Sequence, residues 1–297
     1  MSTTPRVSLG LPVYNGKTLI AATIESILAQ ELRDFELIIS DNGSTDGTLE
    51  VCREFAERDP RVVVIEGGRN VGATRNFNRV FEFARAPYFK WAAHDDHYEP
   101  TFLSRCVEAL DRDPRAVLAY TAAVDIDPAT GAVFGPVDYE VGTDLPDPVA
   151  RYAEVLLRPH PCFQVFGVIR SDVLAQTALI GSYSGSDRVL LGELALHGRF
   201  IEIPDRLFLH GEHADRSVNA HLYEHDRYAW FDPRLAGKTT FPYWRLLREV
   251  SAALRRAPLG PRTRARAAGV VARFGMQYRI DLARDLARPV KRRLSRG

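Results

Sequence analysis

The chain has 297 residues, of which 45% are hydrophobic and 26% charged, and its formal net charge is +1. This is ordinary globular composition, which excludes intrinsic disorder and collagen-like fibres, and the length fits one large α/β domain or two smaller ones. No uncharged apolar run reaches the roughly 18 residues of a transmembrane helix, and the N-terminus lacks the layout of a signal peptide. Cys52, Cys106 and Cys162 form no CxxC pair, so we expect a cytoplasmic location without a disulfide scaffold or zinc ribbon.

Charge is distributed unevenly along the chain. Residues 255–297 contain 13 Lys and Arg and two acids, Asp281 and Asp285, which gives them a net charge of +11. The other 254 residues therefore carry a net charge of −10. A mildly acidic body followed by a strongly basic segment predicts that the two parts do different jobs.

The first hundred residues alternate between strand and helix patterns. Short apolar runs predict strands at 7–11, 35–39, 62–65 and 88–92. Amphipathic spacing predicts helices at 18–30, over about a dozen residues after Asp46-Gly47-Thr48, and at 73–84. Residues 62–65 are near-continuously apolar and β-branched, which is typical of a parallel strand buried on both faces. The alternation predicts right-handed βαβ crossovers and a doubly wound sheet.

Beyond residue 100 the alternation is less regular. The patterns predict a helix at 102–110, a strand at 116–120, a hairpin within 124–134 and an irregular loop at 135–148. They then predict helices at 149–157 and 188–197, two short strands at 200–203 and 206–209, and a basic helical segment from about residue 242.

Polar and aromatic residues follow three of the predicted parallel strands. Pro12-Val13-Tyr14-Asn15-Gly16 ends the first strand, residues 41–48 follow the second, and His94-Asp95-Asp96-His97 follow the fourth. In an open α/β sheet, ligands bind outside the carboxyl ends of the strands, so we expect these residues to meet at one rim.

This set of residues suits the chemistry of a nucleotide-sugar. Tyr14 can cover the face of a base, Asp41 can accept a hydrogen bond from a base N–H, and Asp95 can hold a divalent cation that neutralises a leaving diphosphate. No GxGxxG follows the first strand, which disfavours dinucleotide binding, and the absence of GxxxxGK[ST] excludes a P-loop.

Four motifs occur along the chain: Pro12-Val13-Tyr14-Asn15, the run from Asp41 to Thr48, Asn70-Val71-Gly72 with Arg75-Asn76, and Asp95-Asp96 followed by Pro100. In this order they resemble the motifs of glycosyltransferase family 2, over about residues 6–220. The resemblance implies an α/β GT-A fold, a Rossmann-like doubly wound mixed sheet, with the helical basic segment as a C-terminal extension. It also implies transfer with inversion at the anomeric carbon, a nucleotide-sugar donor and a Mn²⁺ or Mg²⁺ cofactor.

The resemblance assigns roles in donor binding to individual residues. Pro12 and Tyr14 are expected to form the lip and the stacking face for the base, Asp41 to read the base, and Arg75 to lie near the nucleotide. We expect residues 1–100 to form the nucleotide-sugar-binding half of the domain, 101–235 the acceptor and catalytic half, and 236–297 the extension.

The metal site is expected to depart from the family pattern. Asp95 matches the metal-binding acid of the DxD motif, and Asp96 a donor-sugar contact. The usual pattern would need a third acid at position 93, where this chain has Ala93, so we expect one metal contact from this motif rather than two. His213, in the segment from Leu209 to Ser217, is the better aligned of two histidines with the family's metal-binding histidine.

Asp187 resembles the family's catalytic base, an acid that opens a helix within a Glu-Asp pair. Ser186 replaces the usual glutamate here. An acid at this place is also commonly an N-cap, and the two roles are compatible because a cap would fix the carboxylate.

Other functions stay open at this stage. UDP is the expected donor nucleotide, with GDP and dTDP as alternatives, and the acceptor is a sugar, lipid-linked or other hydroxyl in cell-surface glycan or glycolipid synthesis. A sugar nucleotidyltransferase would share the fold and the acidic site, although Tyr14-Asn15-Gly16-Lys17 is a poor version of its basic loop. A non-catalytic binding module is kept open by Ala93 and Ser186, whereas nucleic-acid binding is disfavoured by the acidic body.

The basic segment 262–296 predicts attachment to a membrane surface. Val270, Phe274, Tyr278 and Leu282 fall on one stripe of a helix among arginines, as in amphipathic helices that lie in the headgroup plane of anionic bilayers. We therefore expect a cytoplasmic protein with peripheral attachment to the inner face of the cell membrane. The alternative is that this stripe packs on the catalytic domain and the arginines are solvated.

Overall fold

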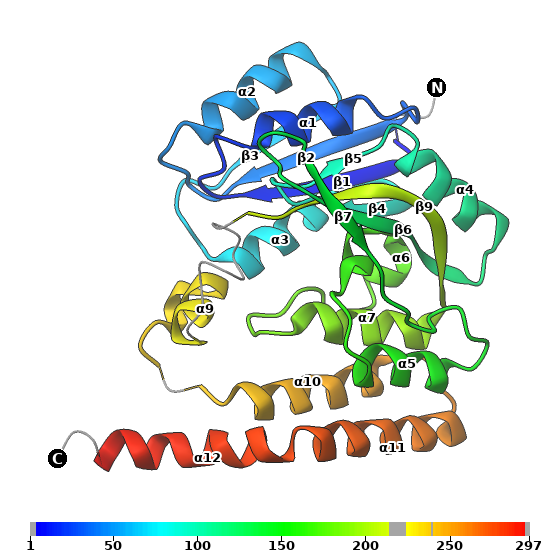
Figure 1. Ribbon diagram of the computed structural model, residues 1–297, viewed down its shortest axis with the longest axis vertical. Helices are drawn as coiled ribbons and strands as arrows, with labels where there is room; N and C mark the ends of the chain where they lie inside the picture. The colour runs from blue at the N-terminus through cyan, green and yellow to red at the C-terminus, as the bar shows by residue number, and fades with distance from the viewer. Residues whose placement is uncertain (1–3, 214–223, 239, 295–297) are drawn as a thin grey trace.

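The computed structural model describes residues 4–213, 224–238 and 240–294 (Figure 1). One mixed sheet runs through the described residues, and its order is β3-β2-β1-β4-β8-β6-β9-β5, with β7 paired to β6. The strands are β1 (Val7–Val13), β2 (Phe35–Asp41), β3 (Val62–Glu66), β4 (Tyr88–Trp91), β5 (His97–Tyr98), β6 (Ala116–Ile126), β7 (Val133–Val137), β8 (Val168–Arg170) and β9 (Arg199–Gly211).

The sheet is parallel in its first half and mixed in its second. The strands β1 to β4 pair in parallel, and the crossovers between them are helical. Further along, β8 is antiparallel to both β4 and β6, whereas β9 runs parallel to β6. The predicted doubly wound mixed sheet is confirmed, and the carboxyl ends of β1, β2 and β4 meet at one rim.

Helices cover both faces of the sheet. One apolar core joins β1 and β2 to α1, α2 and α4, and a second joins the opposite face to α3 and α7 (Figure 1). The helices are α1 (Ile20–Leu28), α2 (Thr48–Arg58), α3 (Ala73–Glu82), α4 (Phe102–Arg112), α5 (Pro148–Leu157), α6 (Ser171–Leu174), α7 (Ser186–His197), α9 (Glu224–Phe231), α10 (Pro242–Arg256), α11 (Pro261–Gln277) and α12 (Arg279–Leu294), with 3₁₀ turns η1 (Phe163–Phe166) and η2 (Pro233–Leu235).

Two strand predictions are wrong, and each has a local cause. The two short strands expected at 200–203 and 206–209 are one strand, β9, because the pairing with β6 steps from Ile203 to Arg206. Pro204 and Asp205 bulge out of the ladder there, so proline interrupts the pattern without ending the strand. The strand β3 is not buried on both faces, since it lies at the sheet edge and its Val63 is 42% exposed.

The C-terminal helices pack on α5 and α7 through a third apolar core. This core joins α5 and α7 to α10 and α11, and its members include Tyr152, Val250, Val270 and Phe274. The apolar stripe that we expected on a membrane is therefore largely buried, with Val270 5%, Phe274 1% and Leu282 9% exposed. This stripe therefore packs on the domain, which was the alternative expectation from the sequence. Within the described residues, none of the helices combines the length and the apolar character needed to cross a membrane.

Candidate active site

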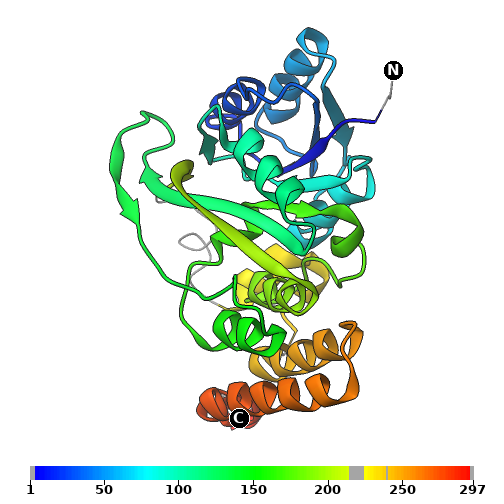
Figure 2. The same ribbon diagram turned by 90° about the vertical axis from the view of Figure 1, so that its right-hand side faces the viewer.

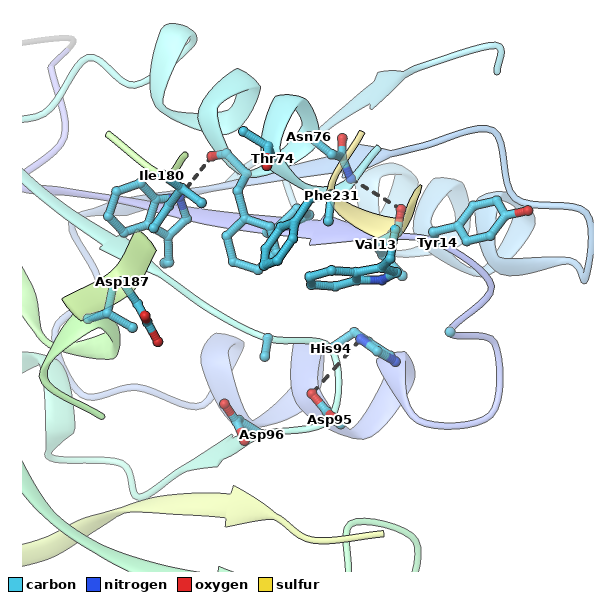
Figure 3. Close-up of a pocket in the computed structure, with 18 of the residues that line it drawn as sticks. Val13, Tyr14, Thr74, Asn76, His94, Asp95, Asp96, Ile180, Asp187 and Phe231 are labelled. Carbon is cyan, nitrogen blue, oxygen red and sulfur yellow. Dashed lines mark hydrogen bonds and ion pairs between the residues drawn. The ribbon is translucent and has the colours of Figure 1, made fainter. Parts of the chain in front are cut away.

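A pocket of about 1000 Å³ opens at the carboxyl ends of β1 and β4 (Figure 3). Six residues predicted from the sequence line it: Pro12, Tyr14, Asp95, Asp96, Asp187 and His213. The other two predicted residues, Asp41 and Arg75, are not among those lining it. Loops that are far apart in the sequence thus meet at one cavity.

The loop after β1 is fixed to the loop after β2. Asn15 has the left-handed φ of 53° that asparagine tolerates, and its side-chain oxygen accepts the Thr45 N–H at 2.9 Å. The Asn15 N–H in turn donates to the Ser44 hydroxyl at 2.9 Å. The neighbouring Tyr14 is 43% exposed, so its ring is available as a stacking face at the pocket mouth.

Asp41 and Arg75 differ from the other predicted donor residues. Asp41 is 1% exposed, and its carboxylate accepts the backbone N–H groups of Gly43 and Ser44 at 3.0 and 3.1 Å. This places Asp41 as a turn-forming acid, and its contact with a base stays a prediction. Arg75 is exposed on α3, whose Thr74, Asn76 and Phe77 line the pocket instead.

Asn76 ties α3 to the ends of two strands. Its amide nitrogen donates to the carbonyls of Ser40 at 2.9 Å and Val13 at 3.3 Å, and its amide oxygen accepts the Ser40 hydroxyl at 2.7 Å. Asn76 is 3% exposed, so these hydrogen bonds satisfy a buried amide. The sequence motif contained Asn76, but its role in holding the rim together was not predicted.

Asp95 and His213 are brought together from distant parts of the chain. His213 Nε2 lies 3.0 Å from Asp95 Oδ2, and both side chains line the pocket. The adjacent Asp96 is 2% exposed and accepts the Gly211 N–H at 3.0 Å. A Cβ at Gly211 would lie 2.0 Å from the Asp95 carbonyl oxygen, so this approach requires glycine.

The residues at this place fit a divalent cation. A carboxylate oxygen and an imidazole nitrogen from Asp95 and His213 are ligand types that Mn²⁺ accepts, and the open pocket leaves room for diphosphate oxygens beside them. Ala93 also lines the pocket, at the place where the family pattern has an acid.

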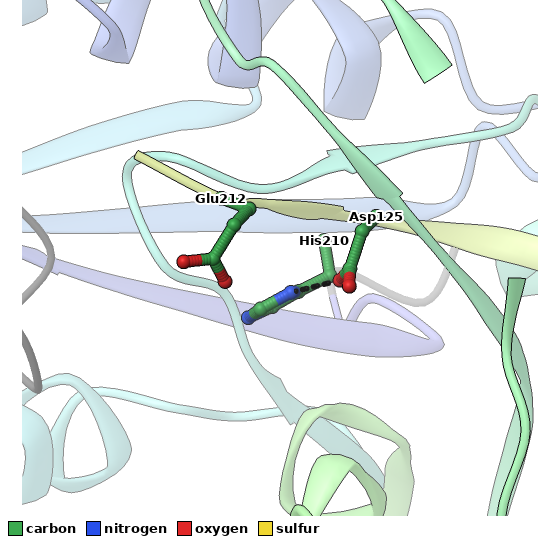
Figure 4. Close-up of side chains that lie close together, drawn as sticks. All are labelled: Asp125, His210 and Glu212. Atoms are coloured by element: carbon green, nitrogen blue, oxygen red, sulfur yellow. Dashed lines mark hydrogen bonds and ion pairs between the residues drawn. The ribbon is translucent and has the colours of Figure 1, made fainter. Parts of the chain in front are cut away.

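A second group of candidate metal ligands lies nearby (Figure 4). Ligand atoms of Asp125, His210 and Glu212 all lie within 4.8 Å of one another, and His210 Nδ1 is 2.7 Å from Asp125 Oδ1. His210 also lines the pocket, with its ring centroid 4.4 Å from that of Phe163. The sequence carries no local signal for this group, because Asp125 and His210 meet only through the pairing of β6 with β9.

Asp187 enters the pocket from the first turn of α7 (Figure 3). The N-cap is Gly185, with φ of 81°, so Asp187 is not itself the cap. Its Oδ1 accepts the Arg188 N–H at 2.7 Å, and desolvation raises its pKa above the ordinary value of 3.8. A raised pKa makes the ionised carboxylate a stronger proton acceptor.

An aromatic wall completes the pocket and was not predicted. Trp230 and Phe231 from α9 line it together with Phe77 from α3 and Trp91 from β4. The helix α9 lies against the start of α3, where a Cβ at Gly72 would be 2.4 Å from the Phe231 carbonyl oxygen. The sequence gives no sign of this wall, because no spacing pattern indicates that α9 lies against α3.

Comparisons with known proteins agree with the motifs. Residues 8–133 match the family model "Glycosyl transferase family 2". A chondroitin synthase from Escherichia coli is 33% identical over 123 residues, which is 41% of this chain and 18% of the synthase. The chain thus matches less than a fifth of the length of that relative.

Two solved structures are similar in fold over most of the chain. Staphylococcus aureus TarS, residues 1–349, in complex with UDP has a TM-score of 0.65 at 14% identity, covering 92% of this chain and 71% of that one. A mannosyltransferase from Pyrobaculum calidifontis, in complex with GDP-Man and Mn²⁺, has a TM-score of 0.55 at 18% identity, covering 96% and 85%. Residues 8–133 therefore match the model of glycosyltransferase family 2, and the chain has the GT-A fold.

Proposed function

We propose that this chain is an inverting glycosyltransferase that moves a sugar from a nucleotide-diphosphate donor to an acceptor hydroxyl. The observation that carries the proposal is the convergence of Asp187, the Asp95–His213 pair and Tyr14 on one pocket. Its family and fold support the same reaction class.

Asp187 acts as the general base in this proposal. Its carboxylate accepts the proton of the acceptor hydroxyl while that oxygen bonds to the anomeric carbon. The bond from the anomeric carbon to the diphosphate oxygen breaks on the opposite side, and the nucleoside diphosphate leaves with that electron pair. Desolvation raises the pKa of Asp187, which makes its ionised carboxylate a stronger proton acceptor in this step.

Asp95 and His213 are the residues that would hold Mn²⁺ or Mg²⁺. Such a cation supplies neutralisation of the charge that develops on a leaving diphosphate. Asp96, whose Oδ1 binds the Gly211 N–H, keeps the loop that carries Asp95 against the end of β9. The Mn²⁺ in the mannosyltransferase structure supports a cation in a protein of this fold.

UDP is the donor nucleotide that we favour. TarS, which has the higher TM-score of the two structures described above, was solved with UDP. The mannosyltransferase was solved with GDP-Man, so GDP is the alternative donor nucleotide. Pro12 and the exposed Tyr14 would cover the base. The likeness to a chondroitin synthase supports a role in the synthesis of cell-surface polysaccharide or glycolipid.

A donor screen tests the proposal. Release of UDP, GDP and dTDP would be measured from a panel of sugar nucleotides, with and without Mn²⁺ and with a mixture of hydroxyl acceptors. We expect Mn²⁺-dependent release of one nucleoside diphosphate. Pyrophosphate release from UTP and a sugar 1-phosphate would instead favour a nucleotidyltransferase, and tight binding without any turnover would favour a binding module.

A further inference from the structure

The C-terminal helices carry a second apolar stripe, opposite the buried one. Its members are three or four residues apart along α11 and α12, and all are exposed. Met276 is 67% and Ile280 55% exposed, and both lie in the middle of the stripe. This outer stripe consists of Ala265, Gly269, Ala272, Met276, Ile280, Ala283 and Ala287.

The outer stripe is separate from the core of the protein. The buried face of the same helices, with Val270, Phe274 and Leu282, packs toward α10. Asp285, also on that inner side, accepts the Tyr243 N–H at the start of α10 at 2.8 Å. In Figures 1 and 2, α11 and α12 form the end of the molecule farthest from α1 and α2, with α10 between them and the rest. The outer stripe therefore faces away from the sheet.

Positive charge flanks the outer stripe. Residues 261–287 contain six arginines and two aspartates. One of the aspartates, Asp285, is fully buried, and the other, Asp281, pairs with Arg284. Arg262, Arg273 and Arg279 are exposed beside the stripe. The remaining sequence to residue 297 adds five more basic residues and no acid.

We propose that the outer face of α11 and α12 docks on an anionic lipid surface. A shallow apolar stripe with arginines on both sides fits the boundary between headgroups and acyl chains, where the helices would lie parallel to the bilayer. Trp244, which is 43% exposed and donates its indole N–H to the Leu282 carbonyl, lies on α10 beside α12 and suits the same interface. The proposal is independent of the proposed function.

A lipid surface matches this face better than a second copy of the chain does. Two copies joined through their outer stripes would bring the exposed Arg262, Arg273 and Arg279 of one copy close to those of the other. Neither aspartate of residues 261–287 would compensate them, because Asp285 is buried and Asp281 pairs with Arg284. An anionic bilayer instead supplies negative charge across a whole plane. Charge complementarity thus identifies the partner.

The test uses the full chain and point variants, because removing α11 and α12 would uncover the inner core. Co-flotation would be measured with vesicles of phosphatidylcholine, with and without phosphatidylglycerol. Met276→Glu with Ile280→Glu changes the outer stripe. Val133→Glu with Phe134→Glu is the matched control, because these side chains are 68% and 61% exposed on β7, far from α11 and α12 in both views.

We expect the wild-type chain to float with phosphatidylglycerol vesicles, to float much less with phosphatidylcholine alone, and to be released by high salt. The Met276/Ile280 variant should lose at least about tenfold in partitioning with an unchanged melting temperature, since both side chains are exposed, whereas the Val133/Phe134 variant should bind as wild type. Equal flotation of both variants with wild type would overturn the proposal. So would a wild-type dimer in solution that the Met276/Ile280 variant dissociates.

Discussion

At the scale of single residues, Asp187 meets two requirements of a general base: it faces the pocket and its pKa is raised by desolvation. The first turn of α7 also places it near the positive end of the helix dipole, which favours the ionised form. These influences act in opposite directions, and desolvation is the larger. The net effect is a raised pKa, so the ionised carboxylate of Asp187 is a stronger base than that of an exposed aspartate.

We expect Asp187→Asn to lower kcat by about two to four powers of ten, the usual contribution of a general base. The acid limb of kcat/KM in the wild type should rise with pH through the raised pKa of Asp187, because only the ionised carboxylate accepts a proton. Asp172→Asn, an exposed acid in the first turn of α6, is the matched control. Near-wild-type turnover of the Asp187 variant would remove it as the base.

Two groups of side chains are candidates for the proposed cation site, and single substitutions distinguish between them. We expect Asp95→Ala to abolish Mn²⁺-dependent UDP binding, measured by calorimetry, because it removes the carboxylate that contacts His213. Asp125→Asn should leave that binding intact, since Asp125 belongs to the other group. If Asp125→Asn abolished Mn²⁺-dependent UDP binding and Asp95→Ala did not, the cation would be assigned to Asp125, His210 and Glu212 instead.

How far the sequence predicts the site depends on where each residue lies relative to a strand end. Tyr14 and Asp95 lie in the loops that follow parallel strands, so the rule for α/β sheets predicts that they meet at one rim, and both line the pocket. His210 and Asp125 meet only because β6 and β9 pair in parallel over a long stretch. A pairing across 85 residues leaves no local pattern, so this group could not be predicted.

At the scale of elements, Lys90 joins β4 to η1 from inside the core. Its ammonium donates to the carbonyls of Phe166 at 2.6 Å and Trp91 at 3.1 Å, and it lies 4.0 Å from the centre of the Tyr98 ring. Lys90 has no exposed surface, and desolvation lowers its pKa from 10.5 to about 7.

This lysine makes stability depend on pH in a defined direction. Between about pH 7 and 10 the unfolded chain binds more protons at Lys90 than the folded chain does. The contribution of Lys90 to the free energy of unfolding therefore increases as pH rises. The gain is up to about 1.4 kcal/mol per pH unit. Chemical denaturation from pH 7 to 9 should show a smaller slope for Lys90→Met than for wild type. The exposed Lys238→Met should keep the wild-type slope, and equal slopes for all three would contradict the assignment.

An ion pair fixes α10 to α7. Arg256 Nε lies 2.7 Å from Glu193 Oε1, and Nη2 lies 2.8 Å from Oε2, with the Glu193 side chain only 1% exposed. We expect Arg256→Ala to lower the free energy of unfolding by about 3 kcal/mol, because it leaves the buried carboxylate of Glu193 without this cationic partner. Adding Glu193→Gln should recover part of the loss, and the exposed Arg255→Ala should cost little. Equal losses for Arg255→Ala and Arg256→Ala would show that the pair does not matter.

At the scale of the whole molecule, the described residues show a helical extension that is continuous with the α/β domain. The helices α10 and α11 share a core with α5 and α7, and Tyr152 on α5 donates its hydroxyl to the Val250 carbonyl at 3.0 Å. The sequence correctly predicts a basic helical extension, but an apolar stripe has the same spacing whether it meets protein or lipid. Only the packing of α10 shows that the stripe with Phe274 faces inward and the stripe with Met276 outward.

This continuity predicts that the extension and the α/β domain unfold together. Phe274 is 1% exposed in the shared core, so Phe274→Ala should lower the free energy of unfolding by about 3–5 kcal/mol. Met276→Ala, two residues away and 67% exposed, should change it by less than about 0.5 kcal/mol. Calorimetry of the full chain should show one transition that the Phe274 substitution shifts as a whole. Loss of a side chain from a shared core must lower the stability of every element packed around it. If the thermogram instead shows two transitions, and Phe274→Ala shifts only the earlier one, then the extension folds as an independent unit.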